Sequence, residues 1–130
     1  MVAIMLIAVM SMSSVVAFAS NEGISPYLYH ADRTDISFVA SSSGGYVDVR
    51  YYGYDSFVRA DLTVKIQKRF LWAFWNDVTE WSASSTEVNG HFYNTLALNG
   101  SGTYKATFTL KITGTDGTVD TIEQTIQSKY

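Results

Sequence analysis

The strictest constraint on this chain is an unbroken alternation of apolar and polar residues over residues 104–113. The apolar positions are Tyr104, Ala106, Phe108, Leu110 and Ile112. The positions between them are all threonine or lysine. Because successive side chains of a strand point to opposite faces, this pattern predicts a β-strand with one dry face and one wet face. Half-buried strands of this kind are typical of antiparallel sheets.

Six further segments show strand patterns and are separated by turn signals. They are residues 35–40, 46–52, 59–69, 77–82, 91–98 and 119–127. Asn89-Gly90 predicts a turn, and Asp116-Gly117 predicts a type I′ hairpin, in which both central residues have positive φ. Gln124, on the apolar side of the last segment, predicts an edge strand or a bulge. The chain is therefore expected to be all-β, an antiparallel two-sheet sandwich of about seven strands.

Residues 102–104 make this expectation more specific. Gly102, Thr103 and Tyr104 are similar to the Gly-x-Tyr sequence that opens the sixth strand of immunoglobulin-like and fibronectin-like domains, where the tyrosine hydroxyl caps a corner. Antibody-type domains have a cysteine two residues after that tyrosine, and this chain has Ala106 there. The resemblance therefore implies an immunoglobulin-like sandwich without the disulfide.

The N-terminal segment predicts export. Residues 2–19 carry no charge, and Ala17-Phe18-Ala19 is an A-x-A cleavage sequence after a short apolar run. We expect a signal-peptide helix over residues 1–19, an extended leader over residues 20–34 and the β-sandwich domain over residues 35–130. An uncleaved membrane anchor is the alternative, since a spanning helix needs about 20 apolar residues. No Lys or Arg precedes the apolar run, which leaves open a translation start upstream.

Several short motifs carry a wider resemblance. They are Ile24-Ser25-Pro26, Gly53-Tyr54-Asp55-Ser56, Ile66-Gln67-Lys68 followed by Trp75, Val78 and Trp81, then Gly102-Thr103-Tyr104, and the run from Gly117 to Ile122. In the order and spacing of these motifs, the chain after the signal peptide resembles a group of small secreted bacterial proteins of unknown function. The resemblance implies a sandwich, export and no known activity. The chain departs from the group over residues 69–74, where a polar turn containing glycine is expected.

Composition and motif spacing point away from nucleic acid, metal and catalysis. The formal charge is −3, and the nine basic residues are spread from Arg33 to Lys129, so no patch for a phosphate backbone is expected. The only histidines, His30 and His91, lack zinc-site spacing, and His30 is expected on the surface. The carboxylate pairs are Asp32 with Asp35, Asp77 with Glu80, and Asp116 with Asp120. All of them lie in or beside predicted turns, so we expect no catalytic cleft, no cofactor and no metal.

The candidate contact surface is an aromatic segment that follows Lys68. Its candidate ligand-binding residues are Arg69, Phe70, Trp72, Phe74 and Trp75. The alternation breaks after Arg69, so the segment contains a hairpin turn, and such turns are normally polar and exposed. An exposed apolar patch marks a binding surface. The alternative is that the segment folds back onto the core, against Tyr27 or Tyr29. Trp81 is expected in the core.

These features predict a secreted, non-enzymatic binding or interaction module that uses the aromatic hairpin. The partner would be an extracellular carbohydrate, protein or membrane surface. Two alternatives are a membrane-active or toxin-like protein that inserts the same loop, and a structural envelope protein. Coplanar rings on one face would indicate sugar stacking, whereas a protruding apolar tip without a facing polar cleft would indicate insertion.

Overall fold

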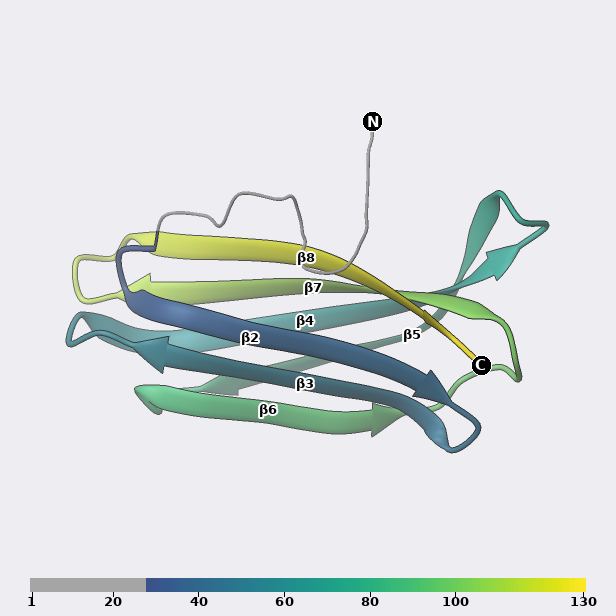
Figure 1. Ribbon diagram of the computed structural model, residues 1–130. Coiled ribbons are helices and arrows are strands. Elements are labelled where there is room, and N and C mark those ends of the chain that lie inside the picture. Colours follow the sequence, from purple (N-terminus) through teal and green to yellow (C-terminus); the bar gives the residue numbers. More distant parts are fainter. Residues whose placement is uncertain (1–27) are drawn as a thin grey trace.

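The computed structural model describes residues 28–130 as two antiparallel β-sheets that lie face to face (Figure 1). One sheet has three strands in the order β2-β3-β6, and the other has four in the order β5-β4-β7-β8. The expected all-β architecture of two antiparallel sheets is confirmed. The expected signal peptide, residues 1–19, and residues 20–27 of the leader lie outside the described residues. Within residues 28–130, no helix is long and apolar enough to cross a membrane.

Seven strands coincide with the seven predicted segments, most of them extended by a few residues. They are β2 (Ala31–Ser41), β3 (Gly44–Gly53), β4 (Phe57–Phe70), β5 (Phe74–Ser85), β6 (Asn89–Leu96), β7 (Thr103–Gly114) and β8 (Val119–Lys129). The first strand begins at Ala31, inside the stretch expected to be a leader. Three hairpins, β2-β3, β4-β5 and β7-β8, each stay within one sheet, and the other connections cross between the sheets.

The core lies between the two sheets and is built mainly by β3, β4 and β7. Its fully buried side chains include Val47, Val49, Tyr51, Leu62, Val64, Ile66, Tyr104, Phe108, Leu110 and Ile112. The inward residues of β7 are the five apolar positions that the alternation predicts. Every described residue of the core cluster lies between Ala31 and Ile122. A chain of residues 20–130 therefore keeps the whole described core and all seven strands.

Two turn predictions are wrong in detail. Asn89-Gly90 is not a turn, because β6 begins there, and a Cβ on Gly90 would lie 2.2 Å from the Tyr51 ring. The glycine therefore serves close packing. The β7-β8 connection is a hairpin as expected, but Gly117 has positive φ (84°) and Asp116 does not, so the turn is not type I′. The expected edge position of Gln124 is confirmed, since β8 ends its sheet, and its pairing with β7 has no bulge.

His30 is buried, so the expectation that it lies on the surface is wrong. Its Nδ1 lies 2.8 Å from the Ser56 hydroxyl, and its Nε2 lies 2.7 Å from the Thr118 hydroxyl. Its backbone N–H donates to Asp120 Oδ2 at 2.7 Å. Burial is tolerated because both ring nitrogens have hydrogen-bond partners. We call His30, Ser56, Thr118 and Asp120 the His30 cluster; it fastens the start of β2 to the β3-β4 and β7-β8 connections.

The core accounts for cooperative folding of residues 20–130. We expect this chain to unfold in a single transition, and Phe108→Ala to lower the free energy of unfolding by about 3–5 kcal/mol because it leaves a cavity between the sheets. Tyr93→Ala is the control, since Tyr93 is an exposed aromatic residue on β6, and it should change that free energy by only about 0.5 kcal/mol. Urea unfolding followed by circular dichroism measures both. Equal losses in the two variants would contradict this account of the core.

The free energy of unfolding should also fall in acid, through a carboxylate at the same end of the sandwich as the His30 cluster. Hydrogen bonds from the side chain and backbone of Thr118 lower the pKa of Asp116 below its ordinary value of 3.8. A depressed carboxyl pKa contributes stability above the unfolded-state value, and this contribution is lost as the pH falls through the folded-state value. We therefore expect the decline of the unfolding free energy below about pH 4 to be shallower in Asp116→Asn. Urea titrations over a pH series test this, and parallel declines would contradict it.

Candidate functional site: an aromatic hairpin tip

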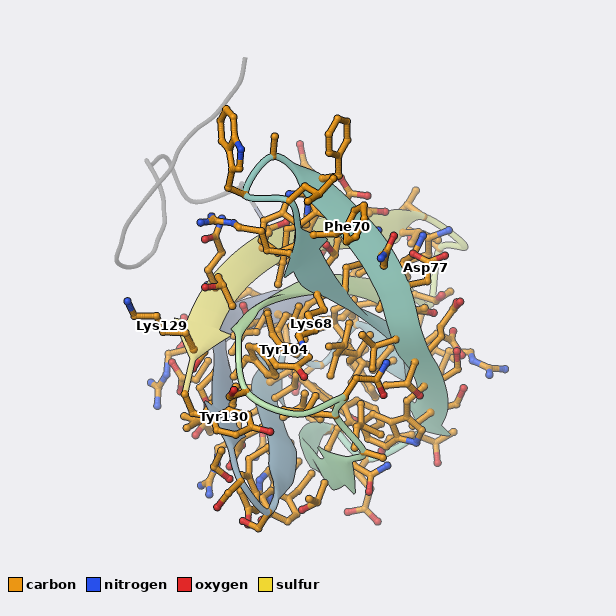
Figure 2. The ribbon with its side chains drawn as sticks, turned by 90° about the vertical axis from the view of Figure 1, so that its right-hand side faces the viewer. Lys68, Phe70, Asp77, Tyr104, Lys129 and Tyr130 are labelled. Carbon is orange, nitrogen blue, oxygen red and sulfur yellow. The ribbon has the colours of Figure 1, made fainter. Side chains whose placement is uncertain are left out.

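The β4-β5 hairpin extends beyond the rest of its sheet. Pairing of β4 with β7 ends at Lys68 and Tyr104, whereas pairing with β5 continues to Phe70 and Phe74. The last part of the hairpin is therefore a two-stranded ribbon, and it rises above the body of the molecule in both views (Figures 1 and 2). In Figure 2, Phe70 lies in this projection and Lys68 and Tyr104 lie below it.

An irregularity in the pairing of β4 with β5 lies directly below this projection. The register shifts between Ile66 and Gln67, so that Val78 is the extra residue on β5. Such bulges bend the strand and increase its right-handed twist. The half-buried Val78 packs against the core. The bulge therefore accompanies the departure of the hairpin from the plane of the sheet.

The large side chains at the end of the hairpin are exposed. Relative exposures are 48% for Phe70, 63% for Leu71, 85% for Trp72 and 61% for Phe74. We call residues 70–74 the aromatic tip. The alternative in which the segment folds back onto the core is therefore wrong. Tyr29 lies at the opposite end, where its backbone N–H donates to Asp120 Oδ2 at 3.0 Å, and Tyr27 lies outside the described residues.

Trp75, the last of the five candidate residues, differs from the others because it is half-buried and carries two cations. The Arg69 guanidinium lies 5.2 Å from the centre of its ring, and the Lys105 ammonium lies 4.4 Å from it. Both distances are within the range of cation–π attraction. Trp75 therefore belongs to the base of the tip, and it contacts both Arg69 and Lys105.

Lys68, Arg69 and Lys105 form what we call the cationic collar. Lys68 donates to the Asn99 carbonyl, and Arg69 donates to Gln127 at 3.4 Å. Burial and the neighbouring charge of Lys65 lower the pKa of Lys105. Within residues 28–130, no collar cation forms an ion pair with a carboxylate. The collar is therefore a local excess of positive charge on a chain whose formal charge is −3.

A shallow depression of about 390 Å³ lies beside the tip. It is lined by Lys68, Arg69, Phe70, Leu71, Asn76, Val78 and Asn99. Its lining joins collar cations and two amide side chains to the apolar tip, and it includes no carboxylate. This chemistry suits an anionic group that is attached to an apolar body.

The remaining sequence candidates do not converge on the tip. Trp81 is partly buried and packs against the core cluster, close to its expected place. Asp77 accepts from Gln67 at 2.9 Å and lies 3.5 Å from Lys65, and Asp120 belongs to the His30 cluster. No group of three or more metal-ligating side chains occurs in the described part of the chain.

Sequence reasoning missed Lys105, which alternation placed only on a wet face. Its position in the collar follows from the register in which Gln67 pairs with Lys105, and nothing local in the sequence specifies that register. Comparisons with known protein families, with curated proteins and with solved structures found no match to this chain.

Proposed function

We propose that this chain is a secreted, non-enzymatic interaction module that contacts its partner through the aromatic tip. The observation that carries the proposal is the identity of two of the three residues in the turn between β4 and β5. Leu71 and Trp72 have φ of 48° and 53°, the left-handed region that disfavours residues with a side chain. Neither side chain is buried, so no packing in the described residues offsets this cost.

Elsewhere in the described chain, positive φ is confined to glycine. The other residues of this kind within residues 28–130 are Gly44, Gly100, Gly102 and Gly117. Each left-handed residue costs about 1–2 kcal/mol when it is not glycine. Strained residues of this kind cluster at functional sites. Leucine and tryptophan at the tip therefore support a role that depends on their side chains and not on the stability of the turn.

We also propose that the sandwich is of the immunoglobulin-like or fibronectin-like type, related to the small secreted bacterial proteins that its motifs resemble. Two observations support this. β6 lies beside β3 in the opposite sheet from β5, its neighbour in sequence. The Tyr104 hydroxyl donates to the Gly100 carbonyl at 2.5 Å, the corner contact that the Gly-x-Tyr resemblance implies.

A structural envelope role is less well supported than a contact role. A purely structural domain gains nothing from an exposed tryptophan in a strained turn, because a polar turn would be more stable and less prone to associate. Export itself is proposed from the apolar N-terminal run and its Ala17-Phe18-Ala19 sequence.

Replacing the turn residues should stabilise the domain. With Leu71→Asn and Trp72→Gly together, the turn has the residues that positive φ favours, and we expect the free energy of unfolding to rise by about 1–2 kcal/mol. Gly117→Ala is the matched control of opposite sign, since Gly117 has positive φ and nothing lies within 4 Å of an added Cβ. It should lower that free energy by about 1 kcal/mol. A loss of stability in the double variant would show that the turn residues are structural.

Quenching of tryptophan fluorescence tests the contact role. In residues 20–130, acrylamide should quench Trp72 strongly, and Trp72→Gly should remove most of the quenchable emission because Trp75 and Trp81 are half-buried. Addition of a true partner surface should suppress the quenching only while Trp72 is present. Cell-wall polysaccharide, zwitterionic vesicles and anionic vesicles are the surfaces to compare. If none of them protects Trp72, the proposed contact role loses its support.

A further inference from the structure

We propose that the partner of the aromatic tip is the interface of an anionic lipid bilayer, an inference that rests on the contact role proposed above. Leu71, Trp72 and Phe74 would enter the boundary between headgroups and acyl chains. The cationic collar would lie against the lipid phosphates. The domain would thus bind a membrane surface at its hairpin end without crossing the membrane.

The first support is the order of chemistry along the hairpin. The apolar residues occupy the turn and the Phe70-Phe74 pair, and the next pair is Arg69 with Trp75. At about 3.3 Å per residue, the distance along the strand from the turn to Arg69 is roughly 7–10 Å. Amphipathic elements bury their apolar faces about 5–10 Å into the headgroup boundary. Insertion to the depth of the apolar residues therefore brings Arg69 to the level of the phosphates.

The second support is the composition of the collar level. Tryptophan, lysine and arginine are the residues that favour the bilayer interface, and Trp75, Arg69 and Lys105 lie together there. Residues 68–76 contain no acidic residue. The nearest carboxylate along β5, Asp77, lies next to Gln67 and Lys65. A phosphate at this level therefore meets cations that have no carboxylate partner within residues 28–130.

The third support is the depression beside the tip. Lys68 and Arg69 supply its positive charge, and Asn76 and Asn99 supply amide groups. Phe70 and Leu71 form its apolar side. A phosphodiester headgroup has the matching arrangement, since its charge is joined to an apolar chain. The depression is open, which suits a headgroup that remains part of a lipid layer.

Protein and sugar partners fit the tip less well. A stable protein interface buries about 800 Å² on each partner with about 20–30 residues a side, and this tip has only four large apolar side chains. Sugar stacking favours coplanar rings on one face. The rings of the tip lie at the end of a two-stranded ribbon that extends past β7, which is the arrangement expected for insertion.

Flotation with vesicles tests the inference. The protein is the chain of residues 20–130, which keeps the described core and lacks the apolar N-terminal run that would itself bind lipid. The vesicles are phosphatidylcholine alone and phosphatidylcholine mixed with phosphatidylglycerol. We expect binding to the mixed vesicles, with a blue shift of tryptophan emission and weaker binding at high salt because salt screens the collar. Binding to phosphatidylcholine alone should be much weaker.

Matched variants assign the binding to the tip and the collar. Trp72→Gly should weaken binding by about tenfold or more, and glycine suits the positive φ of that position, so the fold is kept. Phe74→Ser is a second tip variant outside the turn. Arg69→Gln should weaken binding to the anionic vesicles roughly fivefold. The controls are Tyr93→Ala and Lys111→Gln, an exposed aromatic residue and an exposed cation that lie away from the aromatic tip and the collar, and both should bind normally.

The possible outcomes separate this inference from the contact role. Binding that depends on Trp72, Phe74 and Arg69 but not on the controls supports the membrane partner. Protection of Trp72 by polysaccharide and by neither vesicle overturns the membrane partner and leaves the contact role standing. Binding to anionic vesicles that Trp72→Gly and Phe74→Ser leave unchanged overturns the membrane role of the tip. Protection by no surface overturns both proposals.

Discussion

Burial of the inward side chains of β3, β4 and β7 between the two sheets is the interaction on which the other features depend. Leu62, Val64 and Ile66 of β4 are enclosed between the sheets. Because side chains alternate along a strand, a slip of one residue would turn these groups to solvent, so the core fixes the register of β4. The same register decides where Lys68, Arg69 and Phe70 lie. The aromatic tip is thus held in place by a core strand that continues into it.

Irregular backbone is accommodated in opposite ways at the two ends of the sandwich. At the start of β4, the His30 cluster gives each buried polar group a partner, and Gly114 leaves room for the imidazole, since a Cβ there would lie 2.1 Å from His30 Cε1. At the far end of β4, apolar groups are left in water and the backbone is strained. The first arrangement stabilises the fold, whereas the second has a cost that folding does not offset.

Sequence reasoning found the strands because their signal is local. The alternation of Tyr104, Phe108 and Ile112 specifies a dry face without reference to any other strand. It failed where a residue's environment is made by distant parts of the chain. His30 is buried because Ser56 and Thr118 reach its two nitrogens, 26 and 88 residues away. Gly90 resembles a turn residue, but it lies in a strand, and its lack of a side chain leaves room for the Tyr51 ring.

The candidate site shows the same division. The aromatic segment was visible as an excess of large apolar residues where a polar turn was expected. Whether the segment is buried or exposed depends on how far β4 and β5 extend beyond their pairing with β7, and no local sequence pattern specifies that length. Lys105 joined the site only through its register with Gln67 and its contact with Trp75. The kinds of side chain at the site were therefore predictable from the sequence, whereas their positions relative to one another were not.

The strained turn also bears on how tightly a partner can be held. Binding costs free energy when rotamer-rich side chains and loops must be ordered, at about 0.5–1.5 kcal/mol for each side chain. Leu71 and Trp72 have left-handed φ, and Phe70 pairs with Phe74 on either side of the turn. The backbone of the turn is therefore fixed before any contact with a partner. Part of the free-energy cost of ordering the turn is thus borne by folding, and the proposed contact does not add it again. A core that fixes β4 can carry about 2–4 kcal/mol of such strain, since domain stabilities are commonly about 5–15 kcal/mol.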